Sequence, residues 1–256
     1  MLNSCNQSTP TQSQEGFSVT AELLTIAQEN PLTQTAVGLL KASGAQPLWE
    51  EATLQQDNAS KALAVPLIGR SGLLTIILNK DNSVFDVTLT LTNENGVVTF
   101  IDLGNRYGLQ VDSYTEKVIA FGQLPEVALQ SLTPVDEITF LPEDELSTLG
   151  YYDKSECVPD ALYERLISAQ ELYENARDAF LLAAAAAAYK AFQAARICAT
   201  AETGITIPAC LKASKEAAAA AISAAYLGYR MRQAASKVRQ IRRLINERLK
   251  QCKKSN

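Results

Sequence analysis

The middle of the chain alternates apolar and polar residues with a period of two. Residues 85–92 read FDVTLTLT, which predicts a strand with one buried and one solvated face. Similar strands are predicted at Leu63–Ile68, Leu73–Leu78, Val97–Leu103 and Lys117–Phe121. The turn-rich connections between them span three to six residues, which is too short for parallel crossovers. An antiparallel meander is therefore expected.

Two short helical patterns precede these strands, over Phe17–Gln28 and Pro31–Ser43. In the second pattern apolar residues recur at helical spacing, the proline lies in the first turn, and Gly44 follows the end. We therefore expect residues 17–124 to form an acidic α+β domain in which helices cover one face of the meander.

Residues 125–156 form an acidic, irregular stretch between two parts of different composition. The stretch contains Pro134, Pro142 and the run Glu143–Glu145. Exposed charged segments of this kind join domains and attract proteases. We interpret 125–156 as a linker and a candidate processing site.

Residues 157–256 are Ala-rich and helical in pattern, except for a break at Glu202–Pro208. Strong helix formers fill both flanks, and Pro208 is placed to begin the second helix. Two antiparallel helices of some 40 residues, each about 60 Å long, are predicted. The expected fold class is α+β: a helix-backed antiparallel β-meander followed by a long Ala-rich antiparallel α-hairpin with two disulfides.

Four cysteines lie in the hairpin half: Cys157, Cys198, Cys210 and Cys252. These cysteines allow three pairings, and two of them would join cysteines at opposite ends of the hairpin. Only Cys198–Cys210 with Cys157–Cys252 joins cysteines at the same end of the hairpin. The Ala-rich seam is a weak core, and each disulfide can add about 2–4 kcal/mol. Because disulfides persist in oxidising surroundings, this pairing predicts an exported protein. The alternative is four buried thiols on apolar helix faces.

The cysteine pairing sets a register in which facing residue numbers sum to 408 or 409. Large and small residues then meet as Phe180 with Gly228, and Ile167 faces Ile241. Opposite charges meet as Asp160 with Arg248, Glu171 with Lys237 and Asp178 with Arg230. Small and apolar residues recur at heptad-like spacing along the second helix. This seam is Ala217, Ala221, Ala224, Gly228, Met231, Ala235, Val238, Ile241, Ile245 and Leu249.

Composition and charge narrow the classes of function. With 47% hydrophobic and 20% charged residues the chain is of the folded type. Because histidine is absent, Ser-His-Asp, Cys-His and most zinc chemistries are excluded in cis. No phosphate-binding glycine loop, nucleophile elbow or metal signature occurs in the sequence. We therefore expect no enzyme activity, no cofactor and no metal.

The net charge of −5 conceals two oppositely charged halves. Seven basic and twenty acidic residues precede position 157, a net charge of −13, whereas sixteen basic and eight acidic residues follow, a net charge of +8. An acidic block joined to a cationic one indicates internal neutralisation or an anionic partner.

The basic charge gathers between Arg230 and Lys254, interleaved with Ile241, Leu244, Ile245 and Leu249. The residues predicted to bind a membrane or a partner are Arg230, Arg232, Lys237, Arg239, Arg242, Arg243, Arg248, Lys250, Lys253 and Lys254. A cationic amphipathic helix binds anionic surfaces. We favour lipid or a protein partner over nucleic acid, because this segment lacks aromatic residues for base stacking. The alternative is a solvated basic face balanced by the other helix.

The stretch Leu2-Asn3-Ser4-Cys5, followed by a polar tether, resembles the lipobox of bacterial lipoproteins. This resemblance implies lipidation at Cys5 and attachment of the protein to a membrane surface, with residues 1–16 as the tether. Only Met1 precedes the motif, so this interpretation requires a start upstream. The alternative is a free terminal thiol.

A second resemblance lies at the hairpin turn. Ile197-Cys198, then Gly204-Ile205-Thr206-Ile207-Pro208, then Cys210 is similar to the Cys-flanked stretch of halocin-type peptide bacteriocins. That family is made as two-part precursors, which release an antimicrobial peptide from an N-terminal region that can serve as immunity protein.

Together these patterns predict an exported, non-enzymatic two-part protein. Its disulfide-bonded cationic hairpin, residues 157–256, would act on an anionic membrane or a partner in the manner of a bacteriocin precursor. The alternative is a surface lipoprotein that serves as an interaction module, with the hairpin as a rigid spacer or oligomerisation arm.

Overall fold

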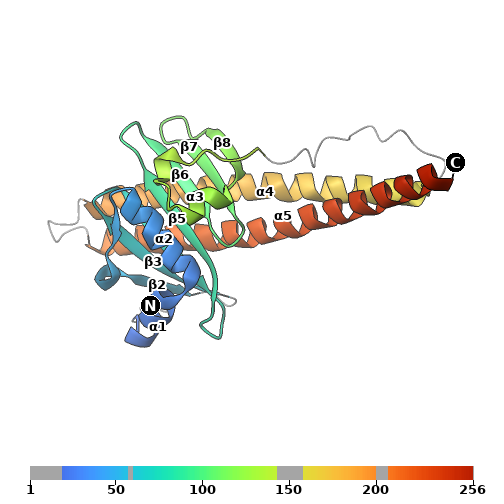
Figure 1. Cartoon of the computed structure of the whole chain (residues 1–256). Helices are drawn as coiled ribbons and strands as arrows, with labels where there is room; N and C mark the ends of the chain where they lie inside the picture. The colour runs from blue at the N-terminus through green and yellow to red at the C-terminus, as the bar shows by residue number, and fades with distance from the viewer. Residues whose placement is uncertain (1–18, 57–59, 143–157, 200–206, 256) are drawn as a thin grey trace, which may run out of the picture.

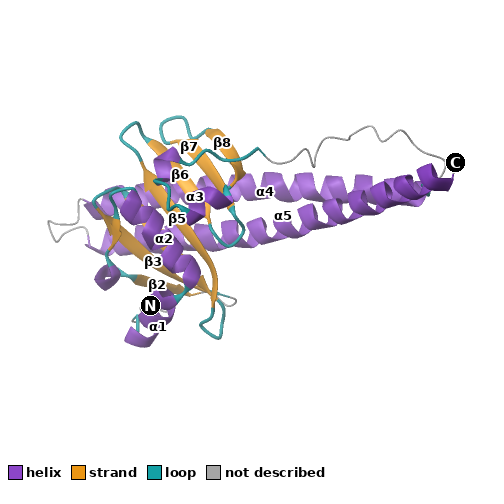
Figure 2. Cartoon of the chain, in the orientation of Figure 1, coloured by secondary structure: helices purple, strands orange, loops and turns teal. Residues whose placement is uncertain are grey.

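The computed structural model describes residues 19–56, 60–142, 158–199 and 207–255, which form three layers. Short helices cover one face of an antiparallel sheet, and a long helical hairpin packs on the other face and extends well past it (Figures 1 and 2). The expected fold class is confirmed in its main parts. The hairpin is not a separate body, because one apolar cluster contains side chains of both the hairpin and the sheet.

Two capped helices begin the described chain. Helix α1 spans Ala21–Glu29 and its N-cap Thr20 accepts a hydrogen bond from the Leu23 amide. Helix α2 spans Pro31–Ala42, close to its predicted bounds, and its N-cap is Asn30. Both helices bury apolar side chains against the sheet.

The sheet is a meander, as predicted, in which each strand from β3 to β8 pairs antiparallel with the next. The short strands β1 and β2 both pair with β3. The strand bounds are β1 Gln46–Pro47, β2 Thr53–Gln56, β3 Lys61–Ile68, β4 Gly72–Leu78, β5 Val84–Thr92, β6 Val97–Asp102, β7 Tyr107–Asp112 and β8 Val118–Gln123. A short 3-10 turn, η1, spans Trp49–Glu51.

Strand β7 was not predicted, because Gly108 made its first residues resemble a turn. A Cβ atom at Gly108 would lie 2.3 Å from Cε1 of Phe140, so the glycine makes room for that ring against the sheet. The sequence pattern cannot show this requirement, since Phe140 lies 32 residues further along the chain.

The prediction of a solvated face on strand β5 was wrong. Thr88 and Thr90, on the face expected to be wet, are buried. Val87, Leu89 and Leu91 of β5 pack towards α1 and α2, and the hairpin covers the opposite face. The strand is therefore enclosed on both sides.

The segment 125–142 differs from the expected linker. It contains helix α3, Glu126–Gln130, and a 3-10 turn η2, Val135–Glu137, and both contribute to the core beneath α2. The rest of the predicted linker and candidate processing site, residues 143–156, lies outside the described residues.

The hairpin consists of α4, Asp160–Ala199, and α5, Ile207–Ser255. The predicted Cys198–Cys210 disulfide is confirmed, with 4.7 Å between the Cα atoms. Cys198–Cys210 is the disulfide seen among the described residues. The second predicted disulfide, Cys157–Cys252, stays a prediction because Cys157 lies outside the described residues. No helix in the described ranges has the length and apolar content needed to cross a membrane.

The predicted register also holds at the middle of the hairpin. A Cβ on Gly228 would lie 3.1 Å from Cε2 of Phe180, so the ring packs over the glycine. The predicted seam is buried at nearly every position. Among the described residues, however, Glu171 and Asp178 form no ion pair with α5; Asp178 instead contacts Arg177. Exposed charges gain too little from pairing to be held across the helices.

Candidate functional site

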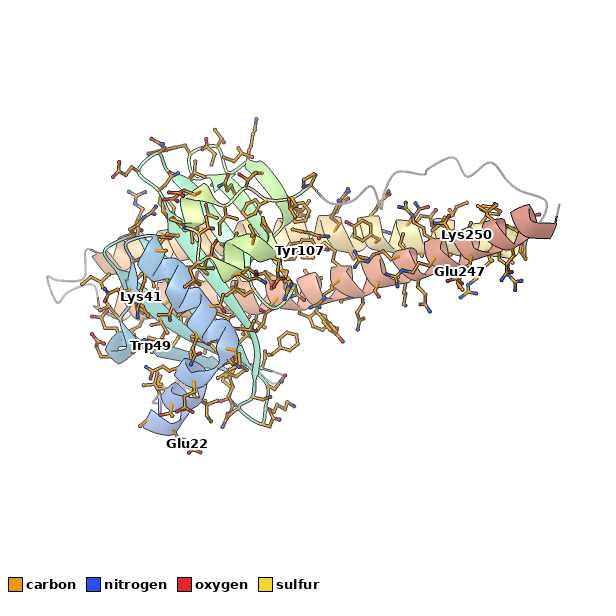
Figure 3. The ribbon with its side chains drawn as sticks, in the orientation of Figure 1. Glu22, Lys41, Trp49, Tyr107, Glu247 and Lys250 are labelled. Carbon is orange, nitrogen blue, oxygen red and sulfur yellow. A yellow bond between two sulfur atoms is a disulfide. The ribbon has the colours of Figure 1, made fainter. Side chains whose placement is uncertain are left out.

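Eight of the ten predicted binding residues lie on the part of the hairpin that extends past the sheet, and Arg230 and Arg232 precede it. We call residues 160–176 of α4 and 233–255 of α5 the arm. By sequence the α5 side of the arm has a net charge of +7 and the α4 side −3. The arm therefore has one strongly basic edge, marked by Lys250 in Figure 3.

The ten predicted cations are not equivalent in the structure. Those exposed along α5 are Arg230, Arg232, Lys237, Arg243, Arg248 and Lys250, and Arg239 and Arg242 are half-buried. Arg232 is used within the fold, because its Nη1 donates to the carbonyl of Gly104 at 2.8 Å. Lys253 and Lys254 lie in the last turn of α5, and their side chains are outside the described part of the chain.

Three of the exposed cations are available to a partner. Within the described residues, Lys237, Arg243 and Lys250 form no ion pair, and the acid nearest to them in sequence is Glu247. Exposed, unneutralised cations of this kind attract anionic surfaces.

The apolar side of the arm is already occupied. Val238, Ile241 and Ile245 are buried against α4, and only Leu244 of the predicted apolar set is exposed. The amphipathic pattern of α5 is thus explained by helix packing, and the folded arm offers a membrane its charges rather than an apolar face.

A cluster of three polar side chains is buried where the sheet meets the hairpin. Asn105 Nδ2 lies 3.0 Å from Asp86 Oδ2, 2.9 Å from Asp102 Oδ2 and 3.1 Å from the Ala225 carbonyl oxygen of α5. Asp86 and Asp102 are only 1% and 0% exposed. The cluster therefore joins β5 and β6 to α5.

Burial and mutual repulsion favour the protonated form of this cluster. Burial raises the pKa of Asp86 and, together with the neighbouring Asp86 charge, raises the pKa of Asp102 well above its ordinary value. Asp86 Oδ1 accepts hydrogen bonds from the amides of Val87 and Gly104, which favour its charged form. The protonated form is therefore favoured more strongly at Asp102 than at Asp86.

The burial of these two acids was not predicted from the sequence. The alternating pattern of residues 85–92 placed Asp86 on a solvated face, and no pattern marked Asp102, which ends the apolar strand β6. The available signal was position: Asp102 lies two residues after Phe100 and so points to the same face as that buried ring.

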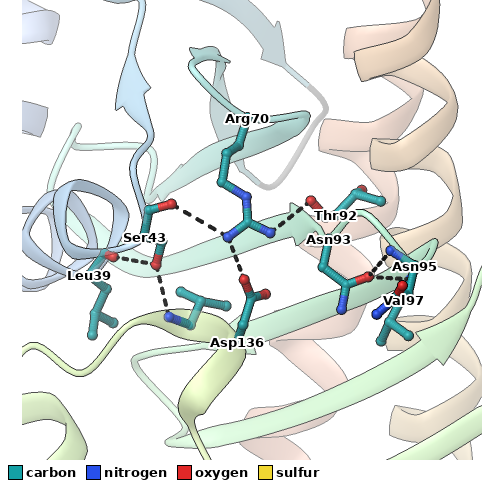
Figure 4. Close-up of polar contacts among 9 residues, drawn as sticks. Leu39, Ser43, Arg70, Thr92, Asn93, Asn95, Val97 and Asp136 are labelled. Carbon is teal, nitrogen blue, oxygen red and sulfur yellow. Dashed lines mark hydrogen bonds and ion pairs between the residues drawn. The ribbon is translucent and has the colours of Figure 1, made fainter.

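A second polar junction ties the helical layer to the sheet (Figure 4). Arg70, in the turn after β3, donates from Nη1 to Asp136 and to the Ser43 carbonyl, and from Nη2 to the Thr92 carbonyl at 3.0 Å. Ser43 Oγ accepts from the Val135 amide at 2.8 Å. A polar cavity of about 740 Å³ lies beside this junction, but Asp136 already neutralises Arg70.

Comparison of the chain with protein-family models, curated proteins and solved structures finds no match in any of the three. Fold and site together define an α+β protein with a disulfide-linked helical hairpin that carries a basic edge. The lipobox-like Cys5 and the bacteriocin-like residues 204–206 lie outside the described part of the chain, and both resemblances stay predictions. Function is therefore inferred from geometry and charge.

Proposed function

We propose that this is an exported, non-enzymatic binding protein whose arm attaches to an anionic lipid surface. The observation that carries the proposal is the row of exposed cations on α5, Lys237, Arg243 and Lys250, which have no ion-pair partners among the described residues. Each Lys or Arg close to an anionic bilayer contributes about 1 kcal/mol to binding. Several such cations on one rigid helix contribute to binding together.

Attachment is peripheral in this proposal, without insertion. Insertion would require Val238, Ile241 and Ile245 to leave α4, and the shared core with the sheet opposes that opening. A bacteriocin-like release of the hairpin would also expose the sheet face that it covers. We therefore propose that the folded chain binds the membrane surface, and we expect the test to distinguish this binding from lysis.

The acidic body supports a defined orientation on the surface. Residues before position 157 have a net charge of −13, so an anionic bilayer repels the body while it attracts the basic edge. Export is proposed from the Cys198–Cys210 disulfide, and the second pair, Cys157–Cys252, belongs to the same proposal. Lipidation at Cys5 would add a second anchor.

The test is co-sedimentation of the full chain with two kinds of vesicle. One is phosphatidylcholine alone, and the other contains about 30% phosphatidylglycerol, which gives a surface charge density of about the physiological order. We expect binding to the anionic vesicles only, with loss at high salt. The triple variant Lys237→Glu, Arg243→Glu, Lys250→Glu removes three cations and should weaken binding by about 3 kcal/mol or more, at least about 150-fold.

The matched control places the same change in net charge elsewhere, as Lys41→Glu, Lys80→Glu, Lys212→Glu. These three lysines are exposed and lie off the arm. The control should retain most of the binding. Equal loss in both variants would contradict a role for the arm, and release of an entrapped dye by the wild-type chain would favour the lytic function.

A second candidate function is docking of the arm to a protein partner. A groove of about 640 Å³ runs along the arm, and its lining includes Leu172 and Leu244, which are 59% and 39% exposed. Exposed leucines in a groove favour an apolar contact. Sedimentation of the chain at increasing concentration tests whether that partner is a second copy of the chain; the uncharged variant Leu172→Ser should abolish self-association without affecting vesicle binding.

A further inference from the structure

An uncharged groove lies between the β4–β5 hairpin and helix α5, away from the basic edge of the arm. It has a volume of about 570 Å³. Its floor includes Ile77 and Leu78 at the end of β4, which are fully buried. Volumes between about 300 and 1,000 Å³ are typical of small-molecule sites.

Aromatic side chains from two elements form the walls. Phe85 of β5 and Tyr229 of α5 meet edge to face, with ring centroids 6.1 Å apart. Tyr226 lies three residues before Tyr229 and therefore on the same side of α5. Their exposed fractions are 57% for Tyr226, 42% for Tyr229 and 37% for Phe85, so the rings face the groove and solvent rather than the core. Exposed rings in such an arrangement can stack on a flat ligand.

Polar but uncharged groups complete the rim. Asn79 uses its Nδ2 to donate to Ser83 Oγ at 3.0 Å, which leaves its carbonyl oxygen as an acceptor on the rim. Ser223 and Ser60 also line the groove, and Ser223 Oγ donates to the Ala219 carbonyl at 3.4 Å, so its lone pairs can accept. None of the lining side chains carries a formal charge at neutral pH. The lining therefore offers no ion-pair partner to a charged ligand.

We propose that this groove binds a small uncharged molecule with a flat ring system and a hydrogen-bonding group at its edge. The apolar floor and aromatic walls would cover the ring, and the rim would bind the polar edge. A charged ligand would lose solvation without gaining a counter-charge. This site goes beyond the lipid binding proposed above and uses none of the cations of the arm.

The test uses the full chain and two probes of one shape, 2-naphthol and the anion 2-naphthoate, followed by ligand-observed NMR. We expect saturable binding of 2-naphthol and binding of 2-naphthoate that is about tenfold weaker or more. Ser223→Trp, which fills the groove from an exposed position, should abolish 2-naphthol binding. Tyr226→Ala, which removes one wall, should weaken it about fivefold.

The matched control is Leu182→Ala, because Leu182 is an apolar side chain of α4 that is 76% exposed and lies outside the groove. This variant should bind 2-naphthol as the wild type does. Circular dichroism confirms that each variant is folded. Absence of saturable binding, equal binding of the two probes, or binding unchanged by Ser223→Trp would each overturn the proposal.

Discussion

Replacing Asp102 by Asn should make the stability of the protein less dependent on pH. Asp102 is buried beside Asp86, and burial together with the Asp86 charge raises its pKa well above the ordinary value, which favours its protonated form in the folded state. An Asn amide has nearly the shape of a protonated carboxyl and can likewise donate a hydrogen bond to Asp86. The variant thus imitates the protonated cluster without a group that titrates.

The sign follows from proton linkage. In the unfolded chain an aspartate has a pKa of about 3.9, so above that pH the unfolded chain has released a proton that the folded protein still holds. The contribution of Asp102 is fully present below about pH 3.9 and is lost as the pH rises through the raised folded-state pKa. The loss is about 1.4 kcal/mol per pH unit for one proton.

The expected result is a free energy of unfolding that falls less steeply with pH in Asp102→Asn than in the wild type. Between pH 5 and pH 7 the variant should gain about 2.7 kcal/mol relative to the wild type, for as long as Asp102 stays protonated. The assay is urea unfolding followed by far-ultraviolet circular dichroism at pH 5, 6 and 7.

Asp112→Asn is the matched control. Hydrogen bonds from the amides of Thr115 and Tyr114 lower the pKa of Asp112, so its contribution is present above the unfolded-state value and is lost only as the pH falls towards its own pKa. Its difference from the wild type should therefore be constant between pH 5 and 7. If the difference in the free energy of unfolding between Asp102→Asn and the wild type is also constant over this range, the inference that the pKa of Asp102 is raised in the folded state is refuted.

Three further predictions concern the hairpin. Gly228→Ala should destabilise the fold by about 1–3 kcal/mol in urea despite the better helix propensity of alanine, because its Cβ would lie 2.8 Å from Oδ2 of Asp102. Replacing Cys198 and Cys210 by Ser should lower the free energy of unfolding by about 3 kcal/mol, from the entropy of a short loop. Intact mass after alkylation, with and without reductant, should count two disulfides; a count of one would contradict the second pairing.

The predictable parts of the fold rest on interactions between residues close in sequence. The helix caps at Thr20 and Asn30 and the short turns between strands are local interactions of this kind. The observed helix α2 and the observed meander therefore agree closely with their predictions. The Cys198–Cys210 disulfide was also predictable, because its two cysteines are separated by 12 positions in sequence and flank the turn between the two long helices.

The candidate sites were predictable only in part. The cations of α5 stand out in the sequence, whereas the groove of Phe85 and Tyr229 brings together residues 144 positions apart. The same is true of Arg70 and Asp136, which are 66 residues apart. No local pattern marks such partners, because their proximity depends on how the layers pack.

The sequence by itself determined most of the elements, their antiparallel order, the turn of the hairpin and the separation of charge, but not strand β7 or helix α3. These depend on periodicity and on short-range geometry, which composition and spacing express directly. Only the tertiary structure decided that the hairpin covers the second face of the sheet. That packing encloses Asp86 and Asp102, occupies the apolar side of α5 and leaves its cations exposed, since burial of a face depends on which partner covers it.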